Sequence, residues 1–317
     1  MSGVQRRVFL RDSGRAAFGA AASLLWPRRV AAAQADDPVR PRVSLTIDDP
    51  DVASSLPWRQ ANRLFLDALG SRNLKAALFV CGKRVAEADG GRLIGEWDEA
   101  GHAIGSHSYS HLTFLRRTSY DDFAADFLRN EPIVAPYRNR VRLFRYPLLK
   151  EGDTAEKRDR FRALLREHDY RPGHVTIDAS DWYVNQRYIE RRKAAPPTSP
   201  DRYRDFLLTH LVDRASYYRQ LIRDVAGRDV PHTLLVHYNE LTAVSVNELL
   251  RGFERAGWEW VNADRAFMDP VYQRAPQTLP AGESLAWALA AESGRAGLRW
   301  PGEDSVYEAP KLDALGL

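Results

Sequence analysis

The sequence predicts an α/β protein built as a closed or nearly closed (β/α) barrel with a short C-terminal helical extension. Short apolar runs typical of strands alternate with segments whose apolar residues recur at helical spacing. Strands that alternate with helices form a parallel sheet, because each helical crossover returns the chain to the same edge. More than five such units indicate a closed or nearly closed barrel. Every polar motif described below follows a strand, which is where functional residues of such barrels lie.

The strands are predicted from short apolar runs that end in polar or turn-forming residues. They cover residues 43–47, 76–81, 102–104, 141–144, 175–177, 233–236 and 258–261. The single cysteine, Cys81, ends the second of these runs, so no intrachain disulfide is possible. We interpret Cys81 as a small buried residue.

The helices are predicted from apolar residues that recur every three or four positions. They are centred on residues 61–69, 93–97, 123–128, 161–168, 208–222 and 249–253. Gly70 and Gly101 are suited to cap the first two of these helices. A polar, proline-containing insert, 187–200, is expected before the long helix. The tail 276–317 is expected to hold one amphipathic helix, 284–292, followed by a loose end.

Length and composition limit the class of protein. The 317 residues suffice for one large domain or two small ones, and a hydrophobic content of 44% excludes a disordered chain. The net charge of +4 is spread along the chain without a dense basic block, which argues against nucleic acid as a partner. We divide the chain into a signal segment, 1–35, a barrel domain, 36–275, and an extension, 276–317, that packs on the barrel.

The N-terminal segment has the order of features typical of a twin-arginine export signal. Arg6 and Arg7 precede an alanine-rich apolar stretch, 16–26, and a small-residue cleavage pattern follows at 31–35. The apolar stretch is too short to span a bilayer. We therefore expect a periplasmic or secreted mature protein, with the Tat translocase as a partner during export and no stable membrane insertion after cleavage.

Two polar pairs suggest a metal site. His107 and His111 are four residues apart, and on a helical turn this spacing places both imidazoles on one face. Asp48 and Asp49 end the first predicted strand, where neighbouring side chains point in different directions, so one can bind metal while the other accepts a proton. Taken alone, the histidine pair could be a solvated helix face and the acid pair a turn.

Further polar motifs follow later strands, and they strengthen the interpretation of the two pairs as parts of one site. The five motifs are Thr46-Ile-Asp-Asp49, His107-Ser-Tyr-Ser-His111, Phe144-Arg-Tyr-Pro147, Asp178-Ala-Ser-Asp-Trp182 and Leu234-Leu-Val-His237. In this order they resemble the polysaccharide deacetylase family, also called the NodB-homology or carbohydrate esterase 4 family, over about residues 42–267. The resemblance implies the distorted barrel of that family.

The resemblance also implies a metal site with a proton acceptor beside it. Asp49, His107 and His111 would be the metal ligands, a set that suits Zn²⁺, with other divalent ions possible. Asp48 would be the general base, and Arg145 would orient it and keep it ionised.

The later motifs imply the acid and the walls of the acyl pocket. His237 would be the general acid, paired with Asp181. The backbone N–H of Leu148 would bind the oxyanion, Trp182 would wall the pocket, and Leu235 would line the space for the acetyl methyl group. The chain departs from the family pattern where Asp49 runs into Pro50-Asp51 in place of Gly-Pro, and where Leu148 replaces a frequent aromatic residue. The other histidines, His102, His168, His174, His210 and His232, are expected to be structural.

The expected function is a metal-dependent hydrolase of linear amides, a polysaccharide deacetylase. It would remove acetyl groups from an N-acetylated polysaccharide or cell-wall glycan through water activated by the metal, with O-acetyl groups as an open alternative. Two other functions stay open at this point. One is hydrolysis of another non-peptide C–N bond, such as that of a small cyclic amide or ureide, and the other is glycan binding without turnover.

Overall fold

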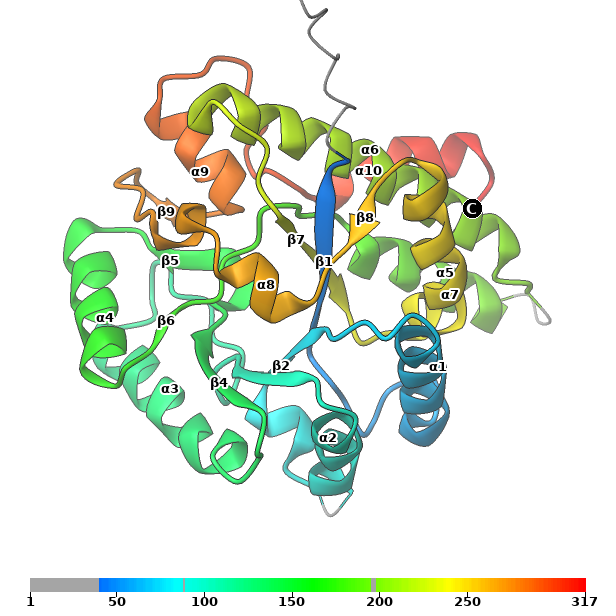
Figure 1. Cartoon of the computed structure of the whole chain (residues 1–317), viewed down its shortest axis with the longest axis horizontal. Helices are drawn as coiled ribbons and strands as arrows, with labels where there is room; N and C mark the ends of the chain where they lie inside the picture. Colours follow the sequence, from blue (N-terminus) through cyan, green and yellow to red (C-terminus); the bar gives the residue numbers. More distant parts are fainter. Residues whose placement is uncertain (1–39, 88, 195–197) are drawn as a thin grey trace, which may run out of the picture. The chain divides into compact units, whose positions relative to one another are not determined.

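The computed structural model describes residues 40–317 except residue 88 and residues 195–197, so the predicted signal segment lies outside the described residues. The described residues form one seven-stranded parallel sheet in the order β6-β4-β3-β2-β1-β7, with β8 beside β1. Its strands are β1 (Arg42–Asp48), β2 (Ala77–Val80), β3 (Ala103–Ser106), β4 (Arg140–Phe144), β6 (Arg171–Pro172), β7 (His232–His237) and β8 (Glu259–Trp260). Figure 1 shows β1 at the centre, with β7, β8 and β2 beside it.

The two edges of the sheet are joined by the segment 171–177, which closes the barrel. At one end the N–H of Gly173 donates to the carbonyl of Phe144 at 2.7 Å, beside the pairing of β6 with β4. At the other end Ile177 bridges to Leu234 of β7, and the N–H of Leu235 donates to the carbonyl of Ile177 at 3.0 Å. The predicted fold class, a distorted (β/α) barrel, is therefore confirmed. The expected strand 175–177 is reduced to this bridge.

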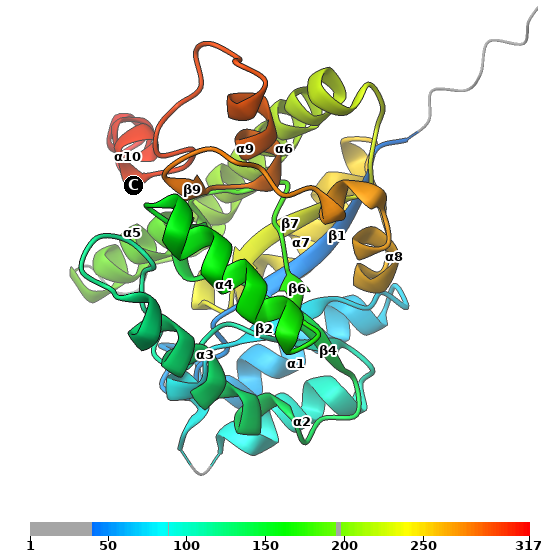
Figure 2. The ribbon, with the colours of Figure 1, turned by 90° about the vertical axis from the view of Figure 1, so that its left-hand side faces the viewer.

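Helices cover the outside of the barrel (Figures 1 and 2). They are α1 (Trp58–Gly70), α2 (Gly90–Glu99), α3 (Tyr120–Val134), α4 (Ala155–Glu167), α5 (Asp181–Ala194), α6 (Asp201–Ala226), α7 (Glu240–Arg255) and α8 (Ala263–Phe267). Side chains of Ser119, Thr154 and Asn239 accept backbone N–H groups in the first turns of α3, α4 and α7. These caps satisfy N–H groups that have no partner within the helix.

Two expectations about helices were wrong. The stretch expected to be an insert, 187–200, begins inside helix α5, which extends from Asp181 to Ala194. Helix α5 buries only Asp181, Val184 and Tyr188, so its sequence lacks the apolar stripe that identifies a helix. The loose end expected after residue 292 contains a further helix, α10 (Ser305–Ala314), capped by Asp304.

The C-terminal extension shares the core of the barrel. Helix α9 (Leu285–Glu292) is buried on most of its surface and packs against α6, and Leu285 and Leu289 belong to the same hydrophobic core as the strands. A two-stranded antiparallel sheet, β5 (Lys150–Gly152) with β9 (Ala281–Gly282), joins the extension to the loop after β4. Among the described residues, no helix is long and apolar enough to cross a membrane.

Candidate active site

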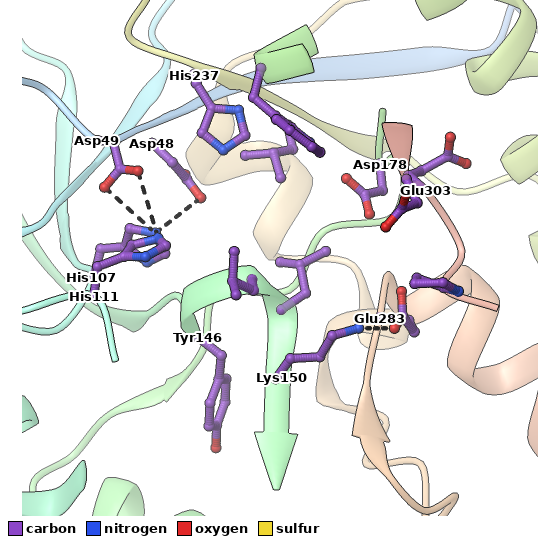
Figure 3. Close-up of a pocket in the computed structure, with 16 residues that line it drawn as sticks. Asp48, Asp49, His107, His111, Tyr146, Lys150, Asp178, His237, Glu283 and Glu303 are labelled. Carbon is purple, nitrogen blue, oxygen red and sulfur yellow. Dashed lines mark hydrogen bonds and ion pairs between the residues drawn. The ribbon is translucent and has the colours of Figure 1, made fainter. Parts of the chain in front are cut away.

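The predicted site residues gather where the parallel strands end. Asp48 is the last residue of β1 and His237 the last of β7, while His107 and Arg145 directly follow β3 and β4. Parallel strands deliver their C-terminal ends to one edge of the sheet, so residues far apart in sequence meet there. Figure 3 shows Asp48, Asp49, His107, His111 and His237 around one pocket.

The histidine pair does not lie on a helical turn, which corrects the geometry expected from its spacing. Residues 107–111 form a loop in which Ser108 and His111 take left-handed backbone angles, with φ of 60° and 58°. The hydroxyl of Ser108 accepts the N–H of His111 at 3.1 Å, and the carboxylate of Asp126 accepts two further N–H groups of the loop. This tight loop brings the two imidazole rings to a centroid distance of 4.9 Å.

Asp49, His107 and His111 fit a divalent metal ion. Their ligand atoms all lie within 4.8 Å of one another, with 3.6 Å between Asp49 Oδ2 and His111 Nε2. The Nδ1–H of His107 donates to the carbonyl of Arg145 at 2.8 Å, so a neutral ring turns the lone pair of its Nε2 toward Asp49.

The protonation state of the two histidines and the hydrogen bonding of Asp49 also suit a metal. Burial lowers the pKa of both histidines to about 4, which keeps them neutral, as metal ligands must be. Oδ1 of Asp49 is buried and has no hydrogen-bond partner. Nε of Arg84 lies 3.1 Å from this oxygen without forming a hydrogen bond, so the oxygen can still bind a metal ion.

Asp48 is held by a buried arginine. Nη1 of Arg145 donates to both oxygens of Asp48 at 3.1 Å, and its Nη2 donates to the hydroxyl of Thr46 at 3.2 Å. Burial raises the pKa of Asp48 to about 6, while the charge of Arg145 opposes the rise. At neutral pH Asp48 is therefore ionised and oriented, as a proton acceptor requires.

His237 is paired with Asp181, as its motif predicts. Nδ1 of His237 donates to Oδ1 of Asp181 at 2.8 Å, and the backbone N–H of His237 donates to Oδ2 at 2.8 Å. Asn239 also donates to Oδ2, at 3.0 Å. Burial lowers the pKa of His237, but the carboxylates of Asp181, Asp48 and Asp49 outweigh it and raise the pKa to about 9. The imidazole is thus protonated at neutral pH, with its Nε2 free for a ligand.

The predicted acyl-pocket residues line a cavity of about 390 Å³ together with the groups above. Leu235 is buried at its floor, whereas Leu148 and Trp182 stand exposed at its rim. Leu148 and Leu149 both take left-handed backbone angles, with φ of 53° and 56°. The sharp turn after Pro147 is therefore fixed in a conformation that costs energy for residues with a Cβ.

Part of this cavity comes from residues that no motif contained. Among them are Lys150, Glu283, Pro301, Glu303 and Asp304. Figure 3 shows Asp178, Glu303 and the Lys150–Glu283 ion pair across the pocket from the metal ligands. The C-terminal extension therefore forms one wall of the site. No local sequence pattern reveals this wall, because its residues from the extension lie more than 100 positions after the metal ligands that they face.

The remaining histidines do not enter the site. Within the described residues a second cluster with ligand-like spacing holds His210, Glu303 and Glu308. However, Nε2 of His210 accepts the N–H of Ser180 at 3.2 Å, so the neutral ring carries its proton on Nδ1, the atom that faces Glu308. His210 thus has no free lone pair for a metal in this arrangement.

Residues 35–172 match the family model described as polysaccharide deacetylase, a segment that contains the first three motifs. This match covers less than half of the chain and agrees with the resemblance to the polysaccharide deacetylase family that the five motifs carry. No curated protein matches the chain.

Several solved structures are similar to this chain. A carbohydrate esterase family 4 pseudoenzyme from Bacillus anthracis is 18% identical, with a TM-score of 0.49, over 73% of this chain and 66% of that one. A family 4 carbohydrate esterase from Streptomyces lividans, in complex with acetate, is 19% identical, with a TM-score of 0.45, over 69% and 90%. The peptidoglycan deacetylase PdaC from Bacillus subtilis is 21% identical, with a TM-score of 0.46, over 73% and 92%.

Proposed function

We propose that this protein is a polysaccharide deacetylase that hydrolyses N-acetyl groups of a polysaccharide or cell-wall glycan in a metal-dependent reaction. The observation that carries the proposal is the composition of one pocket. A carboxylate held by Arg145 and an imidazole held by Asp181 both border the metal-ligand cluster Asp49, His107 and His111. This is the set of groups that a hydrolase needs to activate water and to protonate a leaving amine.

The metal ion, when bound, would polarise the acetyl carbonyl and lower the pKa of water. Zn²⁺ suits two imidazoles and a carboxylate best. Asp48 lies beside this position, with Oδ2 3.7 Å from Nε2 of His107, and accepts the proton of the attacking water. Arg145 keeps the carboxylate of Asp48 aimed at the pocket.

His237 donates the proton that the departing amine needs. Its Nδ1 is occupied by Asp181, so Nε2 is the nitrogen that can reach the substrate. The backbone N–H of Leu148, in the turn after Arg145, stabilises the negative charge that develops on the acetyl oxygen. Leu235 and Trp182, which both line the pocket, contact the methyl group of the acetyl substituent.

A screen for released acetate tests this function. Purified protein is incubated with peptidoglycan, chitin oligomers, exopolysaccharide and O-acetyl xylan, and acetate is measured with and without added Zn²⁺. Metal-dependent release from an N-acetylated glycan supports the proposal. Release from xylan alone would favour O-deacetylation. Glycan binding without release would support the non-catalytic alternative, which the presence of both Asp48 and His237 argues against.

Substitution of Asp181 by asparagine should move the alkaline limb of the activity profile to lower pH. Burial lowers the pKa of His237, but the carboxylate of Asp181 is the chief group that raises it, to about 9. The imidazole is therefore protonated, and able to act as an acid, below that pH. Activity is lost as pH rises through this pKa. Removing the carboxylate lowers the pKa, and the loss then begins at lower pH. The pH profile of kcat/KM on an acetamide substrate measures the shift, and Asp213→Asn, on an exposed part of α6, is the control. An unchanged alkaline limb would contradict the assignment.

Replacement of Arg6 and Arg7 by lysine should leave the precursor in the cytoplasm. We propose that the segment 1–35 is a twin-arginine signal, whose receptor reads the guanidinium pair as an address. Cell fractionation and the mass of the product show where the protein accumulates and whether it has been processed. A processed protein in the periplasm or medium from this variant would indicate another export route.

A further inference from the structure

Arg84 lies beside the metal-ligand cluster and contacts both acids of the loop that follows β1. It belongs to the short helix η1 (Gly82–Val85), directly after β2. Its Nε lies 3.1 Å from Oδ1 of Asp49, and its Nη1 donates to Oδ2 of Asp51 at 3.0 Å. Its backbone carbonyl also accepts the N–H of Val52 at 3.3 Å. One arginine thus fastens the loop 49–52 at three points.

The loop depends on this fastening because its backbone is unusual. Asp49 takes a left-handed angle, with φ of 63°, which is costly for a residue with a Cβ. Asp51 is itself oriented, since its Oδ1 accepts the N–H of Ala53 at 2.8 Å. Asp51 is the extra acid by which the sequence departs from the family pattern at Pro50-Asp51. The structure shows that its carboxylate is the anchor of Arg84.

The contact between Arg84 and Asp49 is an ion pair without a hydrogen bond. Both Nε of Arg84 and Oδ1 of Asp49 are buried and lack a hydrogen-bond partner, although they are 3.1 Å apart. The guanidinium therefore restrains the carboxylate of Asp49 without occupying its oxygens with hydrogen bonds. Oδ2 of Asp49 is left to face His111 at 3.6 Å.

We infer that Arg84 is a positioning residue for the metal ligand Asp49, with Asp51 as its anchor. The inference rests on the proposed function, because it assumes that Asp49, His107 and His111 bind a metal. Carboxylate ligands of metals are held by outer partners, and loss of such a partner typically costs about 10–100-fold in metal affinity. Arg84 fills this role although it lies outside the five motifs.

The charge of Arg84 acts against its positioning effect, since a guanidinium repels a divalent cation. Asp51 offsets this repulsion, because its carboxylate lies on the same guanidinium at 3.0 Å. The Arg84–Asp51 pair therefore carries almost no net charge toward a metal bound at Asp49. The net effect of Arg84 on metal affinity then depends on how firmly it restrains Asp49. Asp51→Asn removes the compensation and loosens the anchor, so it too should weaken metal binding.

Substitution at Arg84 does not open a hole in the core. The side chain is 39% exposed and lines a second cavity of about 350 Å³, which also contacts Asp51 and His111. A variant at this position is therefore expected to fold, and its effect on metal affinity can be measured apart from stability.

The inference is tested by measuring the Zn²⁺ affinity of the metal-free protein in competition with a chelator of known affinity. This measurement needs no assay of activity. We expect Arg84→Met to weaken Zn²⁺ binding about 10–100-fold, Arg84→Lys to recover part of the loss, and Asp51→Asn to fall between wild type and Arg84→Met. The control is Arg251→Met, which removes an exposed arginine paired with Glu248 on α7 and should leave affinity within about twofold, as weak surface ion pairs do.

Two outcomes would overturn the inference, and they can be told apart. Equal or tighter Zn²⁺ binding by Arg84→Met, with wild-type circular dichroism and thermal unfolding in the presence of chelator, would show that Arg84 does not position Asp49. Absence of Zn²⁺ binding by the wild-type protein would instead remove the metal site of the proposed function, and this inference with it.

Discussion

Replacement of His111 by alanine is expected to abolish tight Zn²⁺ binding and acetate release together. His111 supplies one of only two imidazole ligands in the cluster, and its Nε2 lies 3.6 Å from Asp49. With one imidazole and one carboxylate left, a site of this kind loses the ligand number that holds zinc. The fold should survive, because His111 stands in a loop at the pocket rim and is only partly buried.

Elemental analysis of the purified variant, with circular dichroism to verify the fold, provides the measurement. His168→Ala is a suitable control, because His168 ends helix α4 on the outside of the barrel and contacts Phe127. Zinc content of His111→Ala equal to that of the wild type would show that the ligand assignment is wrong. Loss of zinc in His168→Ala would point to a general effect of histidine removal.

The structure brings the predicted site residues together because they follow strands in a parallel sheet. Asp48, His107, Arg145 and His237 each stand at or directly after a strand end, and such ends meet at one edge whatever the helices between them look like. The separate expectation that two histidines at i and i+4 lie on a helical turn was wrong. Ser108 and His111 instead form a left-handed loop, a backbone conformation that spacing does not reveal.

The parts that sequence analysis missed depend on long-range packing. Helix α5 buries three residues along its length, so its polar sequence resembles an insert more than a helix. The C-terminal wall of the pocket is held by the Lys150–Glu283 pair and by Glu303, which accepts hydrogen bonds from Arg214 at 2.7 Å and Tyr218 at 2.8 Å. These contacts join chain segments that are far apart, and no local pattern identifies them.

The pocket also separates the pKa values of Asp48 and His237, the two groups proposed to transfer protons. Burial raises the pKa of Asp48 to about 6, and acidic neighbours raise the pKa of His237 to about 9. Between these values the carboxylate is ionised and the imidazole is protonated, so one residue can accept a proton while the other donates one. This division of roles allows the two groups to be tested separately.

Asp48→Asn and His237→Ala should each lower turnover of an acetamide substrate while metal stays bound. Neither residue belongs to the ligand cluster Asp49, His107 and His111. In the proposed reaction, Asp48→Asn removes the group that accepts a proton from water, and His237→Ala removes the group that protonates the amine. Acid–base steps contribute about 10²–10⁴-fold, so losses of that order in kcat are expected. Parallel zinc analysis of both variants shows whether the metal site is retained.

The leaving group provides a finer test of the two roles. An amide expels an amine that must be protonated before it departs, whereas an activated aryl ester expels a phenolate that needs far less help. His237→Ala should therefore impair amide cleavage much more than aryl-ester cleavage. Asp48→Asn should impair both, because both reactions need activated water. Rates on the two substrates are compared for each variant at a pH between about 6 and 9, where wild-type Asp48 is ionised and His237 protonated. Equal losses on both substrates for His237→Ala would remove its role as general acid and leave it a structural histidine held by Asp181.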